Sequence, residues 1–197
     1  MILYHGTSLS NAKKILKEGL KPRGKKKSNW ETGIGKSRKD LVYLTNCYAC
    51  YYASSSVKKE SDKSVVLKLD IDPKELELYP DEEFLFRSSG IDKMLDDKEE
   101  AIKVYEHIDP KDVKLFKNVE TGEPVSWKDS LEYMGTVAVK KVPKEMIVGY
   151  YIEKKEENFI MYCDPCISPL NYKFCGQMYK DVLKKFKYKP LEKISYE

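Results

Sequence analysis

The chain has few histidines and tryptophans and no long hydrophobic stretch. Its 197 residues include two histidines, two tryptophans and five cysteines. No apolar run approaches the roughly 18 residues that a membrane-spanning helix needs, and the first residues lack the pattern of a secretory signal peptide. We therefore expect no membrane partner and a cytoplasmic location. The length and a hydrophobic content of 41% predict one domain, residues 1–197, with a sizeable core.

Two familiar ligand-binding signatures are missing or incomplete. No glycine-rich fingerprint follows an expected strand, so nothing supports a Rossmann domain. The cysteines form two Cys-x-x-Cys pairs, Cys47 with Cys50 and Cys163 with Cys166, and Cys175 is left over. Two such pairs can hold zinc, but 112 residues separate these pairs and the first falls in an expected helix. We expect reduced thiols and no metal, and keep a zinc-stabilised nucleic-acid-binding protein as an alternative.

Charge is distributed unevenly along the chain. Residues 1–60 hold 13 lysines and arginines against 4 acidic residues, a net charge of +9. Residues 61–125 carry −8 and residues 126–197 carry +3. The basic first part can attract the phosphates of a dinucleotide or of a nucleic acid. An ordinary solvated surface explains the same bias equally well, so both interpretations stay open.

Hydrophobic patterning predicts mostly short strands with a few helices, which indicates an α+β fold. Ser8 is the expected N-cap of the first helix and Gly19 its end. Strands are expected at residues 1–5, 41–45, 65–71, 113–116, 135–139, 147–152 and 159–162, and helices at 9–20, 46–56, 95–104 and 177–186. Residues 21–39 are predicted to be a loop, and residues 74–93 to be irregular.

The most informative segment is Tyr4-His5-Gly6-Thr7-Ser8, at the end of the first expected strand. It places an imidazole, two hydroxyls and bare backbone in one small space, which suits a ribose and a carboxamide. The strand-like run at residues 41–45 adds an aromatic face through Tyr43. These residue types predict a nucleotide-binding site near the start of the chain.

Together these segments resemble the NAD-binding half of the ADP-ribosyltransferases. The similar branch carries a His-Tyr-Glu triad and includes the poly-ADP-ribose polymerases and the diphtheria-type toxins. The His-Gly-Thr segment is also similar to that of RNA 2′-phosphotransferase and of DNA-targeting ADP-ribosyltransferase toxins. The resemblance implies a split β-sheet core with flanking helices, and NAD as co-substrate.

The resemblance also implies roles for individual residues. His5 would bind a ribose, and the backbone of Gly6 would meet the carboxamide, with Thr7 and Ser8 beside them. Tyr43 would stack on the nicotinamide ring. The remaining implied NAD contacts are Thr45 on the second strand, Arg23 at the pyrophosphate, and Tyr52, or its neighbour Tyr51, on the other face of the ring.

The third member of the triad is a glutamate close to a late strand. Breaking the bond between nicotinamide and ribose develops positive charge on the sugar, which a nearby carboxylate stabilises. Glu132 precedes the strand expected at 135–139, in the layout of the similar family, and is our candidate. Glu123 and Glu145 are its rivals.

The sequence thus predicts an enzyme that transfers ADP-ribose from NAD to a protein or a nucleic acid and releases nicotinamide. The lysine-rich part of residues 21–39 is a candidate contact for nucleic-acid phosphates. An inactive module that binds NAD or ADP-ribose is the main alternative, because it needs the ribose and ring contacts but no carboxylate.

Overall fold

A computed structural model describes residues 1–24, 38–90, 99–100, 103, 116–154, 156–159 and 169–196, with side chains in the last range from Gly176 to Ile194. The elements in these ranges follow one another as β1 (Ile2–Ser8), α1 (Leu9–Glu18), β2 (Val42–Thr45), α2 (Ala49–Ser56), β3 (Ser64–Asp70), β4 (Tyr79–Pro80), α3 (Glu82–Ser88), α6 (Trp127–Tyr133), β5 (Thr136–Val139), η2 (Lys144–Met146), β6 (Ile147–Ile152), α7 (Pro169–Lys185) and η4 (Leu191–Tyr196). No helix within the described ranges is long and apolar enough to cross a membrane.

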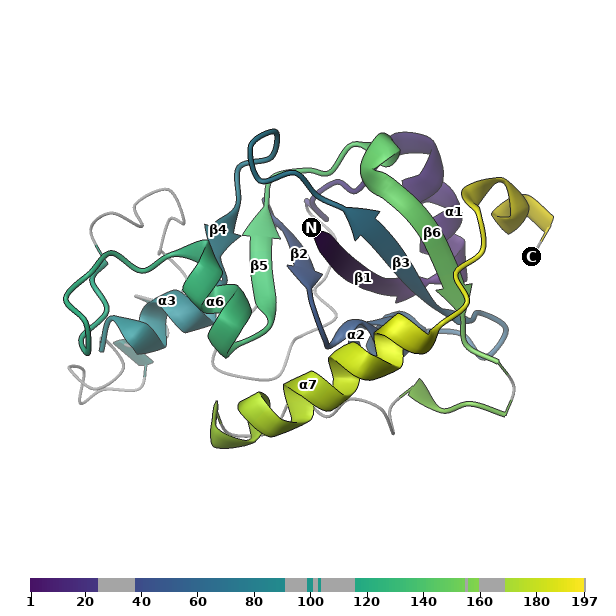
Figure 1. The fold of residues 1–197 in the computed structure, drawn as a ribbon. Coiled ribbons are helices and arrows are strands. Elements are labelled where there is room, and N and C mark those ends of the chain that lie inside the picture. Colours follow the sequence, from purple (N-terminus) through teal and green to yellow (C-terminus); the bar gives the residue numbers. More distant parts are fainter. Residues whose placement is uncertain are drawn as a thin grey trace.

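The strands form one six-stranded sheet in the order β4-β5-β2-β1-β3-β6, with antiparallel neighbours throughout. The pairing is uneven. All seven residues of β1 are in register with β3, whereas β1 and β2 share the single pair Tyr4 and Thr45. The sheet therefore divides between β1 and β2 into a β4-β5-β2 half and a β1-β3-β6 half (Figure 1). This arrangement confirms the α+β class.

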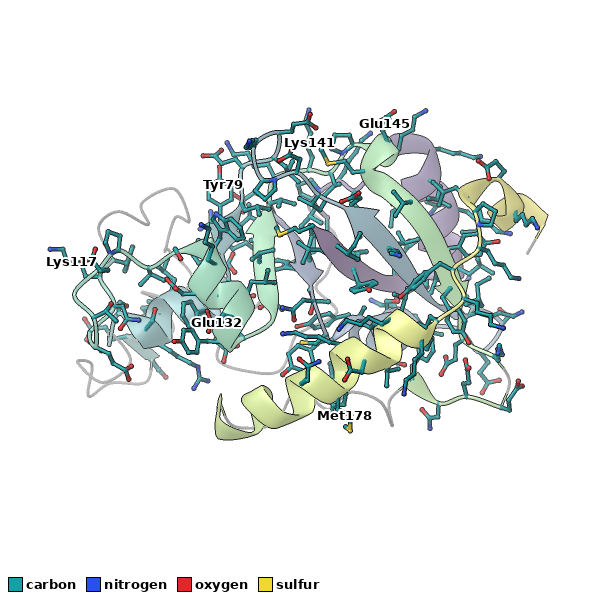
Figure 2. All side chains as sticks on the ribbon, in the orientation of Figure 1. Tyr79, Lys117, Glu132, Lys141, Glu145 and Met178 are labelled. Carbon is teal, nitrogen blue, oxygen red and sulfur yellow. The ribbon has the colours of Figure 1, made fainter. Side chains whose placement is uncertain are left out.

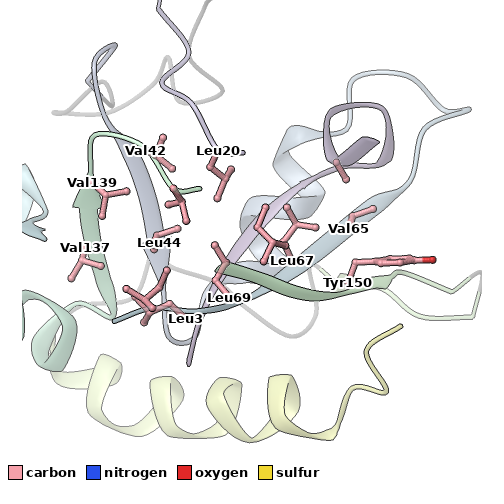
Figure 3. Packing of buried hydrophobic residues seen from close by; sticks show 14 of the residues in the cluster. Leu3, Leu20, Val42, Leu44, Val65, Leu67, Leu69, Val137, Val139 and Tyr150 are labelled. Atoms are coloured by element: carbon pink, nitrogen blue, oxygen red, sulfur yellow. The ribbon is translucent and has the colours of Figure 1, made fainter. Parts of the chain in front are cut away.

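One face of the sheet carries the larger hydrophobic core. Alternate residues of the strands point to this face because side chains in a strand alternate between its two sides. Figure 3 shows the cluster, in which Leu3, Leu44 and Leu67 are no more than 1% exposed. Leu9 and Ala12 of α1 pack against the same cluster. Burial on this scale contributes about 25 cal/mol for each Å² of apolar surface removed from water.

The other face is covered by α2 and by the C-terminal helix α7, which lie below the sheet in Figure 1. Tyr4 on β1 and Tyr179 on α7 belong to this second cluster. Gly6 allows the close approach of β1 to α2, because a Cβ there would collide with the backbone of Ala49 and Ala53. Gly6 is therefore a packing residue in addition to any ligand contact.

Helix starts explain two outcomes of the sequence analysis. Ser8 is confirmed as the N-cap of α1, since its Oγ accepts from the Asn11 amide. The expectation that a helix begins at Asn46 is wrong. The Oγ1 of Thr45 accepts from the amides of Cys47 and Tyr48, which turns the chain before α2 begins at Ala49.

The prediction of irregular structure at residues 74–93 is wrong in part, because β4 and α3 lie there. Asp81 caps α3 by accepting from the Glu83 amide at 2.9 Å. The first helix ends at Glu18, and α7 begins eight residues before the expected 177. The helix expected at 95–104 and the strands expected at 113–116 and 159–162 lie largely outside the described residues.

Candidate functional site

His5 joins the two halves of the sheet where β1 and β2 diverge. Its Nδ1 lies 3.0 Å from the backbone oxygen of Tyr43. A carbonyl oxygen only accepts, so Nδ1 carries the proton and donates. Burial lowers the pKa of His5 below 6.5, which keeps the imidazole neutral at pH 7. In that tautomer Nε2 is an acceptor, and it can receive a hydrogen bond from a ligand hydroxyl.

The hydroxyl of Tyr43 is held from two sides. It donates to Oε1 of Glu82 at 2.6 Å and accepts from the backbone amide of Arg38 at 2.8 Å. The ring packs against a cluster that includes Ala138 and Tyr79. Ala138 on β5 pairs with Tyr43, and Tyr79 on β4 pairs with Ala138. Tyr43 as a whole is half-buried.

Glu82 is an unusual carboxylate because only 2% of its surface is exposed. Its nearest cation is Arg38, whose Nε lies 3.9 Å from Oε1, whereas the same guanidinium contacts Asp40 at 3.0 Å. Burial raises the pKa of Glu82, and the neighbouring Asp81 raises it further. A carboxylic acid that stays protonated close to neutral pH follows from this environment.

Tyr52 on α2 lies in the same electrostatic neighbourhood. Burial raises the pKa of its hydroxyl well above 10, with a further increase from Asp81. Asp81 has the second largest electrostatic influence on the pKa of Tyr43, after Glu82. Asp81 thus raises the pKa of both aromatic residues that the sequence analysis paired. Tyr51, the alternative to Tyr52, packs edge-on against it with ring centroids 5.9 Å apart.

Other predicted ligand contacts are engaged in the fold itself. Thr7 and Ser8 are 4% and 2% exposed, and Ser8 caps α1. Thr45 is 1% exposed and donates through Oγ1 to the Gly135 backbone oxygen at 2.7 Å. The hydroxyls of Ser8 and Thr45 thus stabilise the ends of β1 and β2, which supports the site indirectly.

Arg23 is half-buried, shortly after the bridge that pairs Leu20 with Val142. The lysine-rich segment that follows it, including Lys25, Lys26 and Lys27, lies outside the described residues. The described chain resumes at Arg38, whose backbone amide donates to the Tyr43 hydroxyl.

The three candidate glutamates are all exposed and stand apart from the buried cluster. Glu132 lies on α6 just before β5, and Glu145 lies in η2 beyond the other end of β5 (Figure 2). Glu123 occupies the turn before α6. No hydrogen bond or ion pair joins Glu132 to another residue of the described chain. The structure does not bring Glu132 into contact with His5 or Tyr43.

Sequence reasoning missed Glu82, Arg38 and Asp81. Asp81 and Glu82 follow Pro80 in an acidic stretch, where most carboxylates are exposed, as Glu75 is. One sequence signal was present. The pattern Asp81-Glu82-Glu83 followed by Phe84-Leu85-Phe86 places a cap and two acids before an apolar run, which is typical of a helix N-terminus.

The first cysteine pair is part of the hydrophobic packing. Cys47 and Cys50 are fully buried in the second hydrophobic cluster, the one that contains Tyr4 and Tyr179. Cys163 and Cys166 lie outside the described residues, as does the side chain of Cys175. The described residues contain no cluster of three metal-ligating side chains.

The site thus combines a neutral imidazole acceptor with a tyrosine whose hydroxyl is bonded to a buried acid. These groups suit a ligand that has sugar hydroxyls and a flat ring. In comparisons with known proteins, the chain matches no family model and no curated protein.

Proposed function

We propose that this protein is an ADP-ribosyltransferase that uses NAD. The observation that carries the proposal is the bridge from His5 Nδ1 to the Tyr43 backbone oxygen. It joins the candidate ribose acceptor to the backbone of the residue that carries the candidate aromatic ring, at the division of the sheet. The division itself supports an ADP-ribosyltransferase-like split core.

His5, Tyr43 and Tyr52 would each have a defined role in binding NAD. A ribose hydroxyl would donate to Nε2 of His5, while Tyr43 would pack against the nicotinamide ring. Tyr52 would supply the second aromatic surface. Fixing the sugar and the ring separately favours breakage of the bond between them, because the reacting groups are already oriented as the transition state requires.

In the reaction, the bond between ribose C1 and nicotinamide breaks and nicotinamide leaves with the electron pair. The acceptor nucleophile then bonds to C1 and gives up its proton. Positive charge on the sugar calls for a carboxylate, and Glu132 remains our proposal for it. An exposed carboxylate near β5 is free of competing hydrogen bonds within the described chain.

A second candidate function is a module that binds NAD or ADP-ribose without turnover. The exposure of Glu132, away from the bridge of His5 and Tyr43, favours this alternative. Calorimetry with NAD and an assay for released nicotinamide separate the two. Binding with release supports the transferase, binding without release supports the module, and absence of binding contradicts both.

The acceptor is proposed to be a protein or a nucleic acid. If it is a nucleic acid, replacing Lys25, Lys26 and Lys27 should weaken binding and flatten its salt dependence, which has a slope of about 0.7–0.9 per phosphate contacted. Nicotinamide release in the absence of acceptor should persist. Loss of NAD affinity instead would favour a pyrophosphate contact and a protein acceptor.

A further inference from the structure

We propose that Glu82 is a positioning residue for the nicotinamide ring of NAD, acting through the hydrogen bond that it accepts from the Tyr43 hydroxyl. This inference rests on the proposed function and deepens it. Glu82 is a buried acid outside the His-Tyr-Glu triad, and its role would be to hold the Tyr43 ring in place.

The first argument is that the Tyr43 ring is held at both ends. Its Cα is held in β2, where it faces Ala138 of β5. Its hydroxyl donates to Glu82 at 2.6 Å and accepts from the Arg38 amide at 2.8 Å. One donated and one accepted bond fix the direction of the hydroxyl. Without these two hydrogen bonds, packing alone would leave the ring freer to rotate about its first side-chain torsion.

The second argument is the cost of burying Glu82. A carboxyl that is 2% exposed loses its hydration, and burial without partners is unfavourable. Arg38 does not neutralise it closely, since its Nε lies 3.9 Å away and contacts Asp40 more closely. The hydrogen bond with Tyr43 is the close polar contact that the buried carboxyl makes with another side chain. Stability alone would favour an apolar residue here.

The third argument is how Glu82 is itself held. It opens α3, whose Phe84, Leu85 and Phe86 are buried in one cluster with Val125. The amide of Asp81 donates to the Ser130 Oγ at 2.9 Å, which ties the start of α3 to α6. Ser130 in turn donates to the Thr136 backbone oxygen on β5. The carboxyl of Glu82 is therefore fixed relative to the strand that faces Tyr43.

The test compares two ligands that differ by the nicotinamide. Glu82→Ala should raise the dissociation constant of NAD about tenfold, the effect of one hydrogen bond, and leave that of ADP-ribose unchanged within about twofold. Glu82→Gln keeps an oxygen that can accept from Tyr43, so it should bind NAD nearly as well as wild type. Glu83→Ala, one residue further along α3 and paired with Arg87, is the matched control.

Tyr43→Phe completes the cycle. It keeps the ring and removes the hydroxyl, so Glu82→Ala should have no further effect on NAD affinity in that background. Equal weakening of NAD and ADP-ribose by Glu82→Ala, or additive effects of the two changes, would overturn this inference while the proposed function stands. Wild-type protein that binds neither ligand would overturn both.

Discussion

The imidazole Nδ1 of His5 lies 3.0 Å from the backbone oxygen of Tyr43, across the division between β1 and β2. The bond occurs where the strand pairing stops after Tyr4 and Thr45. It replaces main-chain pairing by a side-chain contact and leaves Nε2 as the acceptor nitrogen of the ring. The tautomer of His5 is thereby determined by the fold.

His5→Ala should weaken NAD binding, because the ribose loses its acceptor and the Tyr43 carbonyl loses its donor. The expected loss is about 1–3 kcal/mol, typical of a buried hydrogen-bonding group. Calorimetry measures it directly. Unchanged affinity would remove His5 from the site.

NAD affinity should also depend on pH through His5. Burial lowers the pKa of His5 below 6.5. The neutral form should therefore persist through neutral pH and become protonated only in more acidic solution. Protonation converts Nε2 from an acceptor to a donor. Affinity should be constant from pH 8 to about 6.5 and fall at lower pH, whereas His5→Ala should show no such fall.

The stability of the folded protein should fall as pH rises, because of Glu82. The pKa of Glu82 is raised from 4.5 to about 8, chiefly by burial and then by Asp81. Between these values the unfolded chain has lost a proton that the folded protein keeps. The free energy of unfolding should therefore decrease as pH rises through this range, by at most about 1.4 kcal/mol per pH unit.

Urea titrations at several pH values measure this dependence. Glu82→Gln mimics the protonated acid, so its stability should vary less between pH 5 and pH 8 than that of wild type. Glu75→Gln, at an exposed glutamate ahead of α3, should keep the wild-type dependence. A steep decline in Glu82→Gln equal to that in wild type would assign the effect to other groups.

Gly6→Ala should destabilise the protein strongly. The added Cβ would collide with backbone atoms of Ala49 and Ala53, which cannot move without shifting α2. Overpacking of this kind costs about 1–3 kcal/mol or more. Gly122→Ala is a useful control, because nothing lies near its Cβ and only its positive φ of 73° opposes the change. A loss no larger than the control's would contradict the close approach.

Glu132→Gln should reduce turnover far more than NAD affinity, because its charge matters most in the transition state. Its exposure predicts that the free energy of unfolding changes by less than about 0.5 kcal/mol. Wild-type turnover in Glu132→Gln, with inactive Glu123→Gln or Glu145→Gln, would move the role to one of its rivals.

Local patterns were sufficient for β1, β3, β5 and β6, since apolar residues and turns mark each of them. Ser8 was found as a cap for the same reason. The start of α2 was misplaced because Thr45, already in the strand, accepts from the amides of Cys47 and Tyr48 and turns the chain before the helix begins. The short elements β4 and α3 were missed because acidic residues surround the apolar run from Phe84 to Phe86.

Sequence reasoning selected candidate site residues only where a short local motif surrounds them. His5 and Tyr43 lie on strands that flank one division, and each was selected from the residues beside it. Glu82 lies 39 residues beyond Tyr43. Its place is fixed by contacts between α3 and α6, which are the bond from the Asp81 amide to Ser130 and the stacking of Phe84 on Tyr133. No sequence pattern marks one buried carboxylate among 32 acidic residues.

The most direct test of the account measures nicotinamide released from NAD by the purified chain, with and without a cell lysate as a source of acceptors. We predict release by wild type, loss of it in His5→Ala and Glu132→Gln, and transfer of labelled ADP-ribose to a macromolecule. Wild-type protein that binds no NAD and releases no nicotinamide, with or without lysate, would contradict the account.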